Sequence, residues 1–365
     1  YHWTIVSGTG VIIENENSPD TTIVHTNGDA EIEAHFTPLY DPIIYVDGDV
    51  SGSGDGGSWD QAFKTIQEAV DVLEFSQEIW VKQGTYVVSS EIIINKPVSL
   101  FGGFDGTETA REQRDLDENE TIIEGTNNAR CFAITDDAVI DGFIMQNTTI
   151  MNHPDTGDNG PGAAMSIISC SPAIMNCAFN KNYINGVDIY NGGALYIYDG
   201  TPTIDNCHFN STRSGEISLG GLGGAVYSVN CMPIFTHCTF INNVTDFGGA
   251  IYGSAVIISC SFTNNRGIYG GGAIYAESPL EISDSHFSNN WTEYKGGAIQ
   301  GTGTFNRCTF LANIAEEGAG GIYSTTNSTI SNSLFIGNEG TLHYSGPYGG
   351  AISLYGHDNV VTNSI

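Results

Sequence analysis

The sequence has few basic residues: 11 Lys and Arg stand against 42 Asp and Glu among 365 residues, and the formal net charge is −31. A surface with this charge repels nucleic acids and anionic membranes. It excludes a nucleic-acid partner and favours neutral glycans, cations or proteins. No hydrophobic run approaches the roughly 20 residues of a membrane helix, and no signal-like segment follows Tyr1. We therefore expect a soluble segment, without direct membrane insertion, that begins after any signal has been removed.

The usual signatures of cysteine chemistry are also missing. The sequence has eight Cys residues but no Cys-x-x-Cys pair and no zinc-ligand spacing with His. Five of the eight recur at one position of a repeated phrase, namely Cys177, Cys207, Cys238, Cys260 and Cys308. This position is typical of a small buried residue rather than of a metal ligand.

The chain is rich in one internal repeat. A first phrase occurs as GGALY (192–196), GGAVY (223–227), GGAIY (248–252), GGAIY (271–275), GGAIQ (296–300), AGGIY (319–323) and GGAIS (349–353). A second phrase, such as SCSFTNN (259–265), places Phe three residues before Asn. Its Phe residues are spaced by 22 to 31 residues and are Phe179, Phe209, Phe240, Phe262, Phe287, Phe310 and Phe335. A period of this size indicates a solenoid.

The local pattern identifies the type of solenoid. Cys or Ser and then Phe two residues later alternate with polar residues, as strands require, and no segment between them has a helical stripe. Three short strands in each repeat make one coil of a parallel β-helix, with coils about 4.8 Å apart. The sequence therefore predicts an all-β, right-handed, single-stranded parallel β-helix in which each Phe stacks on the next.

Two further columns follow from this stacking. Asn follows Phe by three residues in six of seven copies, with Thr212 as the exception, so its amide is expected to form a ladder in the turn. The residue after Gly-Gly-Ala is always aliphatic and faces inward, whereas the next residue faces outward. This outward position holds Tyr196, Tyr227, Tyr252, Tyr275 and Tyr323, interrupted by Gln300.

The two ends of the chain differ from the regular coils, which run from about 161 to 365. Residues 58–73 place Trp59, Phe63 and Ile66 on one helical face, which predicts an amphipathic capping helix over about 58–74 within a β-helix that spans 41–365. Residues 1–40 alternate like strands and are too few for a core of their own. We interpret them as the C-terminal part of a β-sandwich-like surface repeat, and the chain as a segment truncated at both ends.

The quoted phrases resemble known families. The paired GGA[ILV] and FxxN phrases resemble the repeats of chlamydial-type polymorphic outer membrane proteins, whose passenger regions are surface adhesins. The stretch IYVDGDVSGSGDGGSWDQAFKTIQEAV, with IWVKQGTY, resembles the entry region of secreted bacterial right-handed β-helix proteins of the pectate-lyase-like superfamily. The first 38 residues resemble the end of a bacterial surface repeat. These resemblances imply the β-helix fold and an extracellular or cell-surface location. The fold itself hosts lyases, hydrolases and adhesins alike.

Two groups of residues are candidates for ligand binding. The outward tyrosines Tyr196, Tyr227, Tyr252 and Tyr275 either stabilise the sheet through cross-strand contacts or form an aromatic strip for sugar rings. Two adjacent long loops, 181–191 and 211–222, either decorate the surface or line a site. Their best lining residues are Tyr183, Asp188, Tyr190, Arg213 and Glu216.

Candidates for catalysis are sparse. A lyase needs a base and a cation near a uronate, and Arg213 and Arg266 share a phase but lie two coils, or about 10 Å, apart. A hydrolase needs two carboxylates about 5 to 10 Å apart, which Asp136, Asp137 and Asp141 could supply. An Asp before Gly, as in Asp141-Gly142, is also a common turn residue.

One Gly-rich loop is a candidate for calcium. Asp47, Asp49 and Asp55 are spaced through glycine and could ligate calcium by carboxylates and carbonyls. Tight turns and helix capping explain the same residues. No cofactor is required, and calcium is possible.

These observations favour a non-catalytic surface protein, an adhesin or structural stalk that presents loops and an aromatic strip to glycans or surface proteins. The alternatives are a polysaccharide lyase or glycoside hydrolase that acts in a groove near residues 181–222, and a filament subunit that self-associates end to end through open coil ends.

Overall fold

The computed structural model describes residues 43–73, 78–126, 128–151, 162–185, 191–215, 220–341 and 349–365, and four strands within the first 42 residues. The chain divides into two compact units, Tyr1–Pro42 and Ile43–Ile365. In the first unit, β1 (His2–Ser7) pairs antiparallel with β4 (Glu31–His35), and β2 (Val11–Ile13) pairs antiparallel with β3 (Ile23–His25). Among the described residues, no helix has the length and hydrophobicity that crossing a membrane requires.

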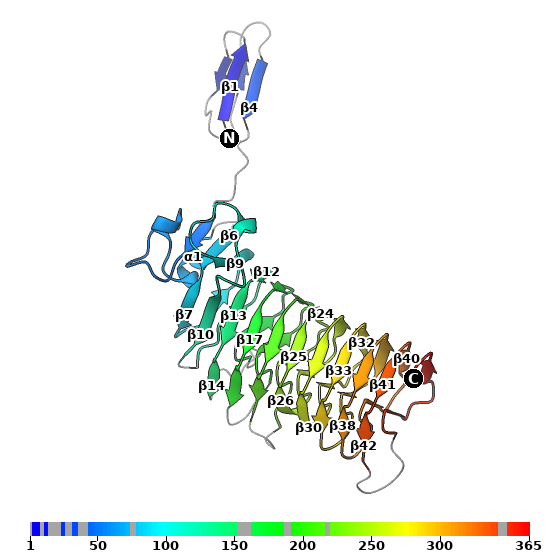
Figure 1. Ribbon diagram of the computed structural model, residues 1–365. Helices are drawn as coiled ribbons and strands as arrows, with labels where there is room; N and C mark the ends of the chain where they lie inside the picture. The colour runs from blue at the N-terminus through cyan, green and yellow to red at the C-terminus, as the bar shows by residue number, and fades with distance from the viewer. Residues whose placement is uncertain are drawn as a thin grey trace. The chain divides into compact units, whose positions relative to one another are not determined.

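The second unit is a right-handed parallel β-helix, as the repeat predicted (Figure 1). Strands of successive coils pair in parallel and form four sheets. The phenylalanine sheet, which carries the Phe column, consists of β7 (Gly84–Val88), β10 (Thr121–Gly125), β13 (Phe143–Gln146), β17 (Ala178–Asn180), β21 (His208–Asn210), β25 (Thr239–Ile241), β29 (Ser261–Thr263), β33 (His286–Ser288), β37 (Thr309–Leu311) and β41 (Leu334–Ile336).

The tyrosine sheet carries the outward tyrosines. It consists of β8 (Ile92–Ile94), β11 (Phe132–Ile134), β15 (Met165–Ile168), β19 (Leu195–Tyr198), β23 (Val226–Val229), β27 (Ile251–Tyr252), β31 (Ile274–Tyr275), β35 (Ile299–Gln300), β39 (Ile322–Ser324) and β43 (Ile352–Leu354).

The other two sheets differ in length. The long sheet consists of β5 (Ile44–Val46), β6 (Glu78–Lys82), β9 (Val98–Phe104), β12 (Ala138–Asp141), β16 (Ala173–Met175), β20 (Thr203–Asp205), β24 (Ile234–Thr236), β28 (Val256–Ile258), β32 (Leu280–Ser283), β36 (Gly303–Asn306), β40 (Thr329–Ser331) and β44 (Val360–Thr362). The short sheet consists of β14 (Thr149–Met151), β18 (Tyr183–Asn185), β22 (Arg213–Ser214), β26 (Val244–Phe247), β30 (Arg266–Gly270), β34 (Trp291–Thr292), β38 (Ile314–Ala315) and β42 (Glu339–Gly340).

The short sheet corrects the prediction of three strands in each coil, because regular coils have four. The residue after each ladder Asn donates its N–H to the ladder position of the preceding coil, as Arg266 does to the Asn243 carbonyl at 2.9 Å. The side chains at this register vary among Tyr183, Arg213 and Trp291, since they face outward. Backbone hydrogen bonds form this pairing in every coil, and no repeated residue marked it in the sequence.

The core consists of the predicted columns. The Phe rings stack in six successive pairs, with centroids 4.6–4.9 Å apart and planes within 6° of parallel. Each buried Phe stabilises the fold by about 2 kcal/mol through the apolar area that it removes from water. The aliphatic residue after Gly-Gly-Ala, such as Ile251 or Ile274, is fully buried beside this stack, so the inward orientation is confirmed.

The asparagine ladder is also confirmed. The Asn265 amide donates to the Phe240 carbonyl at 2.9 Å and to Asn290 Oδ1 at 3.0 Å. Its own Oδ1 accepts from the backbone N–H of Asn243 at 3.1 Å. Asn265 is completely buried, so each ladder amide satisfies turn groups that water cannot reach.

The two positions of the repeated Gly-Gly pair require glycine for different reasons. Gly248 adopts φ +67°, a left-handed conformation in which a side chain is strained. A Cβ on Gly249 would lie 2.1 Å from the Gly272 carbonyl oxygen of the next coil. The repeated phrase therefore serves the fold before any binding role.

The capping helix is shorter than predicted. It is α1 (Ile66–Val72), and Thr65 and Glu68 form a capping box at its start. The backbone of Phe63 exchanges hydrogen bonds with Tyr45 and Asp47, which keeps the preceding residues out of the helix. Trp59 belongs to a separate 3-10 turn, η1 (Trp59–Gln61), and a second such turn is η2 (Arg111–Gln113). The buried side chains of α1 belong to the same hydrophobic cluster as the coils, so the helix covers the end of the core.

The ladder generates a stability prediction. Replacing Asn265 with Ala removes two donors and one acceptor from buried backbone and side-chain groups, so we expect a loss of about 3 kcal/mol in the free energy of unfolding, measured by urea denaturation. The matched control is Asn264→Gly, because Asn264 is exposed and has φ +56°, which Gly adopts readily. Equal losses in the two variants would contradict the structural role of the ladder.

Candidate functional site

The outward face of the tyrosine sheet carries a continuous column of stacked rings. Tyr196, Tyr227, Tyr252 and Tyr275 share one register in successive coils. Their centroids lie 5.7, 5.4 and 5.2 Å apart, with interplanar angles of 26°, 29° and 10°. Because the rings stack, part of each ring face is covered by a neighbouring ring. Tyr196 is buried and the other three are half-buried.

A second aromatic row, which the sequence analysis missed, runs beside this column. Phe247, Tyr269 and Tyr294 come from β26, β30 and the turn after β34, and neighbouring rings lie 5.6 Å apart. Phe247 meets Tyr275 edge to face at 5.3 Å and so joins the two rows. A signal was available, since each of these residues stands one or two positions ahead of a Gly-rich turn. We call the two rows together the aromatic strip, which consists of Tyr196, Tyr227, Tyr252, Tyr275, Phe247, Tyr269 and Tyr294.

Polar groups border the aromatic strip. The exposed Glu277 carboxylate lies next to the Tyr252 hydroxyl, and burial together with this charge raises the pKa of Tyr252 well above its ordinary value. Its hydroxyl therefore remains a hydrogen-bond donor at neutral pH. Gln300 takes the register position between Tyr275 and Tyr323, as the sequence indicated. The Lys295 ammonium lies 4.8 Å from the centre of the Tyr323 ring.

The loop candidates are only partly within the described residues. The Arg213 guanidinium lies 5.4 Å from the centre of the Tyr183 ring, and its Nε donates to the Gly215 carbonyl at 2.9 Å. Tyr183 and Arg213 lie opposite each other in paired strands of adjacent coils. Asp188, Tyr190 and Glu216 lie outside the described residues. The structure thus brings Tyr183 and Arg213 together, in a cation–π contact.

Arg266 has structural contacts of its own. Its guanidinium lies 4.4 Å from the centre of the Trp291 ring and 3.7 Å from a Glu293 oxygen. The register places Val244 between Arg213 and Arg266, so the two arginines are separated by two coils, as expected. At this separation of about 10 Å they do not converge on one carboxylate.

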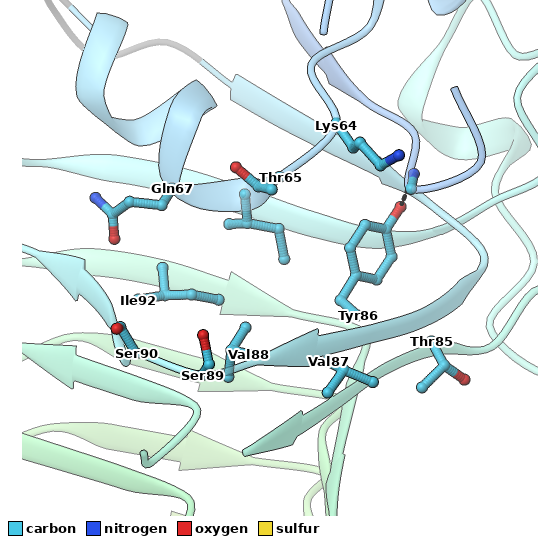
Figure 2. Close-up of a pocket in the computed structure, with 12 residues that line it drawn as sticks. Lys64, Thr65, Gln67, Thr85, Tyr86, Val87, Val88, Ser89, Ser90 and Ile92 are labelled. Atoms are coloured by element: carbon cyan, nitrogen blue, oxygen red, sulfur yellow. Dashed lines mark hydrogen bonds between the residues drawn. The ribbon is translucent and has the colours of Figure 1, made fainter. Parts of the chain in front are cut away.

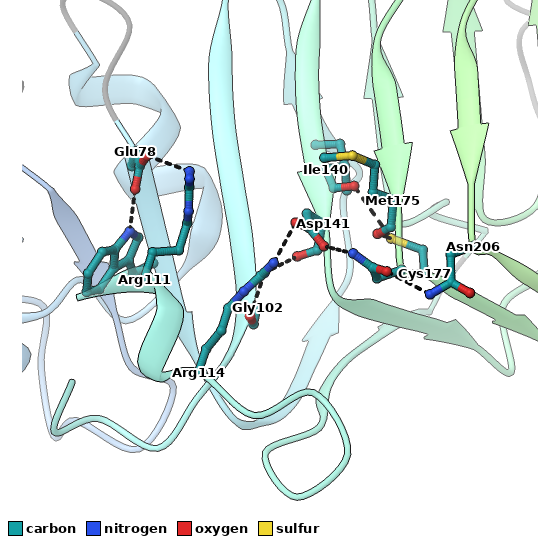
Figure 3. Close-up of polar contacts among 11 residues, drawn as sticks. Glu78, Gly102, Arg111, Arg114, Ile140, Asp141, Met175, Cys177 and Asn206 are labelled. Atoms are coloured by element: carbon teal, nitrogen blue, oxygen red, sulfur yellow. Dashed lines mark hydrogen bonds and ion pairs between the residues drawn. The ribbon is translucent and has the colours of Figure 1, made fainter. Parts of the chain in front are cut away.

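Asp141 belongs to a buried polar network rather than to an open acid pair (Figure 3). Its Oδ2 lies 2.6 Å from Arg114 Nη2, and its Oδ1 accepts from the Asn176 amide at 2.7 Å. The side chains of Asp141 and Arg114 are 6% and 15% exposed. Asp136 precedes β12 and Asp141 ends it, and this strand alone spans about 10 Å. Their separation and the ion pair argue against a hydrolase pair at these two residues.

The calcium candidates Asp47, Asp49 and Asp55 have contacts of their own within the loop. Lys82 Nζ lies 2.8 Å from Asp47 Oδ2 and 3.8 Å from Asp49 Oδ2, and it supplies a positive charge to this loop. Asp55 accepts the Gly57 N–H at 3.0 Å, as a turn residue does. Within the described ranges, no group of three or more His, Cys, Asp or Glu residues could hold a metal ion. Calcium at Asp47 would compete with Lys82.

A separate cavity of about 350 Å³ lies between α1 and the strands β7 and β8 (Figure 2). Ile66, Val88 and Ile92 give it an apolar side, and Ser89 and Ser90 give it hydroxyl groups. Tyr86 lines it as well, but the Tyr86 hydroxyl already accepts from the Gly48 N–H and donates to the Lys82 carbonyl. The cavity contains none of the site residues predicted from the sequence.

These features define a right-handed parallel β-helix whose outer surface carries an aromatic strip. Residues 194–365 match the family model described as "Right handed beta helix region". No curated protein matches the chain.

Several solved structures are similar to this chain. Pectate lyase Pel9A is 14% identical, with 82% of this chain and 77% of that chain covered and a TM-score of 0.46. Geobacillus virus E2 ORF18 is 15% identical, with 84% and 65% covered and a TM-score of 0.44. The catalytic domain of a GH87 alpha-1,3-glucanase is 12% identical, with 94% and 74% covered and a TM-score of 0.36. The lyase and glucanase activities in two of these names are those of the named proteins.

The buried network generates a second prediction. Asp141→Ala leaves the Arg114 guanidinium without its carboxylate, and we expect a loss of about 3 kcal/mol in the free energy of unfolding. Asp136→Ala is the matched control, and we expect a change within about 0.5 kcal/mol, as is usual for residues outside such a network. Thermal and urea unfolding of both variants provide the measurement. A stable Asp141→Ala variant would show that this ion pair does not hold the first coils together.

Proposed function

We propose that this chain is a non-catalytic, glycan-binding protein of the cell exterior and that the aromatic strip is its binding surface. The observation that carries the proposal is the continuity of the strip over successive coils, with Tyr227, Tyr252 and Tyr275 in one register. The resemblance of the paired repeats to those of surface adhesins supports the exterior location.

The chemistry of the aromatic strip suits carbohydrate. Sugar rings have apolar C–H patches, which pack on aromatic edges and faces, and hydroxyl groups, which pair with polar groups at the rim. The strip offers both kinds of group, since Tyr252 and Tyr275 are half-buried and carry hydroxyls, and Tyr294 is 40% exposed. The net charge of −31 disfavours acidic polysaccharides, so the preferred ligand is a neutral glycan.

The repeat of the strip indicates the orientation of the ligand. Equivalent tyrosines recur in four successive coils, from Tyr196 to Tyr275, and successive coils lie about 4.8 Å apart along the helix axis. An extended sugar chain that runs parallel to this axis would meet the same groups at each coil. Several weak contacts of this kind add up to a useful affinity.

The experiment is a screen of the chain against neutral polysaccharides and a glycan array, with and without calcium. Bound glycan and released reducing or unsaturated ends are measured in the same wells. Binding without product is expected. Release of product would overturn the non-catalytic function and favour a lyase or hydrolase. If neither binding nor product is detected, the proposal of a glycan ligand is wrong, and a structural stalk or a filament subunit is favoured.

Variants of one residue test the surface. Tyr252→Ala removes a ring at the centre of the strip, and we expect an affinity loss of about tenfold, or ~1.4 kcal/mol, measured by isothermal titration with the best glycan. Tyr252→Phe keeps the stacked ring and reports on the hydroxyl alone. Tyr183→Ala alters the loop region instead, and we expect no change in affinity. The reverse result would place the ligand at the loops.

A further inference from the structure

A column of buried thiols runs through four consecutive coils. Cys177, Cys207, Cys238 and Cys260 each stand directly before a strand of the phenylalanine sheet and are essentially inaccessible to solvent. The column continues with smaller hydroxyl side chains and one isolated thiol, in the order Ser285, Cys308, Ser333 and Ser364. All eight cysteines of the chain are free thiols.

The four side chains share one orientation. Each Sγ lies next to the carbonyl oxygen two residues earlier in its own coil, at 3.1, 3.3, 3.2 and 3.3 Å in chain order. The strands that follow them pair in register, so equivalent sulfur atoms lie one coil repeat apart, at about 4.8 Å. The contact of Cys260 Sγ with the Cys238 N–H at 3.4 Å confirms the stacking.

This arrangement does not suit a disulfide. A disulfide needs Cβ atoms about 3.5–4.5 Å apart and side chains that turn toward each other. Parallel side chains one coil repeat apart satisfy neither condition, so oxidation would have to displace the backbone. The same column therefore keeps its thiols reduced by geometry.

We propose that the gaps between successive thiols of this column bind cuprous ions in two-coordinate, linear sites. A two-coordinate ion lies midway between its ligands. The metal–thiolate bond is about 2.3 Å for four-coordinate zinc and shorter for a two-coordinate ion, so the two sulfur atoms at each gap have to lie slightly closer together than the coil repeat. Cu(I) favours soft thiolate ligands. Zinc requires four ligands, and the column offers two at each gap.

The proton balance predicts cooperative filling. The first ion replaces the protons of two thiols, and the resulting unit carries one negative charge. Each further ion extends the unit by one thiolate and releases one proton, so the charge stays at −1. Three ions in the gaps 177–207, 207–238 and 238–260 therefore release four protons. A thiol in an apolar interior stays protonated when no metal is bound, because burial disfavours the charged thiolate. The charge of the first ion is the main barrier, and the later ions bind more easily.

The test uses the full chain, reduced and kept under nitrogen, with Cu(I) buffered by a chromogenic chelator. Uptake is followed until it is constant, because the thiols are buried. We expect three ions in each chain, release of four protons, and an X-ray absorption spectrum with two sulfur neighbours. The double variant Cys207→Ser/Cys238→Ser interrupts every gap, and we expect it to bind none. Ser already occupies the same position in three other coils, so this variant is expected to fold, which circular dichroism checks.

The matched control is Cys131→Ser/Cys308→Ser, which removes two thiols outside the four-residue column and should still bind three ions. Equal binding by the two double variants would overturn the proposal, because it would place copper at other thiols. An absence of uptake by the unaltered chain would overturn it as well. Copper with three or more sulfur neighbours would show a site assembled elsewhere.

Discussion

In-register backbone hydrogen bonding between successive coils is the constraint on which the rest of the structure depends. Each coil adds one strand to each of several parallel sheets, so an equivalent residue lies above its predecessor at every position. A residue chosen for one coil must therefore tolerate contact with its own equivalent. Phe, Asn, Cys and Tyr satisfy this condition in different ways, through ring stacking, amide ladders, small polarizable volume and edge exposure.

Charge satisfies this condition poorly, because like charges in a column repel. The structure places opposite or neutral partners where charges stack. Arg307 forms two short contacts, of 2.6 and 2.7 Å, with Asp284 of the preceding coil. The register aligns Asp141 with Met175 and then with Asp205, so these two carboxylates are not adjacent. The Asp141 carboxylate accepts from the Asn176 amide, and the Asn176 Oδ1 accepts from the Asn206 amide (Figure 3). The acidic character of the chain is thus compatible with stacking because charged columns are broken after one or two coils.

Adjacent residues of a strand point to opposite faces of the sheet, so one residue lies in the core and the next lies on the surface. In β27, Ile251 is buried in the common core, whereas Tyr252 belongs to the aromatic strip. The repeat that supports the fold therefore also repeats whatever faces outward. This coupling makes an extended periodic ligand the natural partner of such a surface, and it explains why single convergent sites, like an acid pair, are harder to build on regular coils.

Sequence alone determined the repeating part of the molecule. The spacing of Phe179 through Phe335, the ladder Asn residues and the inward aliphatic positions were all predictable, because equivalent contacts of a solenoid recur in the sequence at a regular spacing.

Tertiary structure decided the features that do not recur at this spacing. The fourth strand of each coil is paired through backbone atoms and so left no residue signature. The pairing of Phe63 with β5 shortened the capping helix, and the ion pair between Arg114 and Asp141 joins residues 27 positions apart. The second aromatic row likewise became a surface only when neighbouring coils brought Phe247, Tyr269 and Tyr294 together, since contacts between residues distant in sequence depend on the path of the chain.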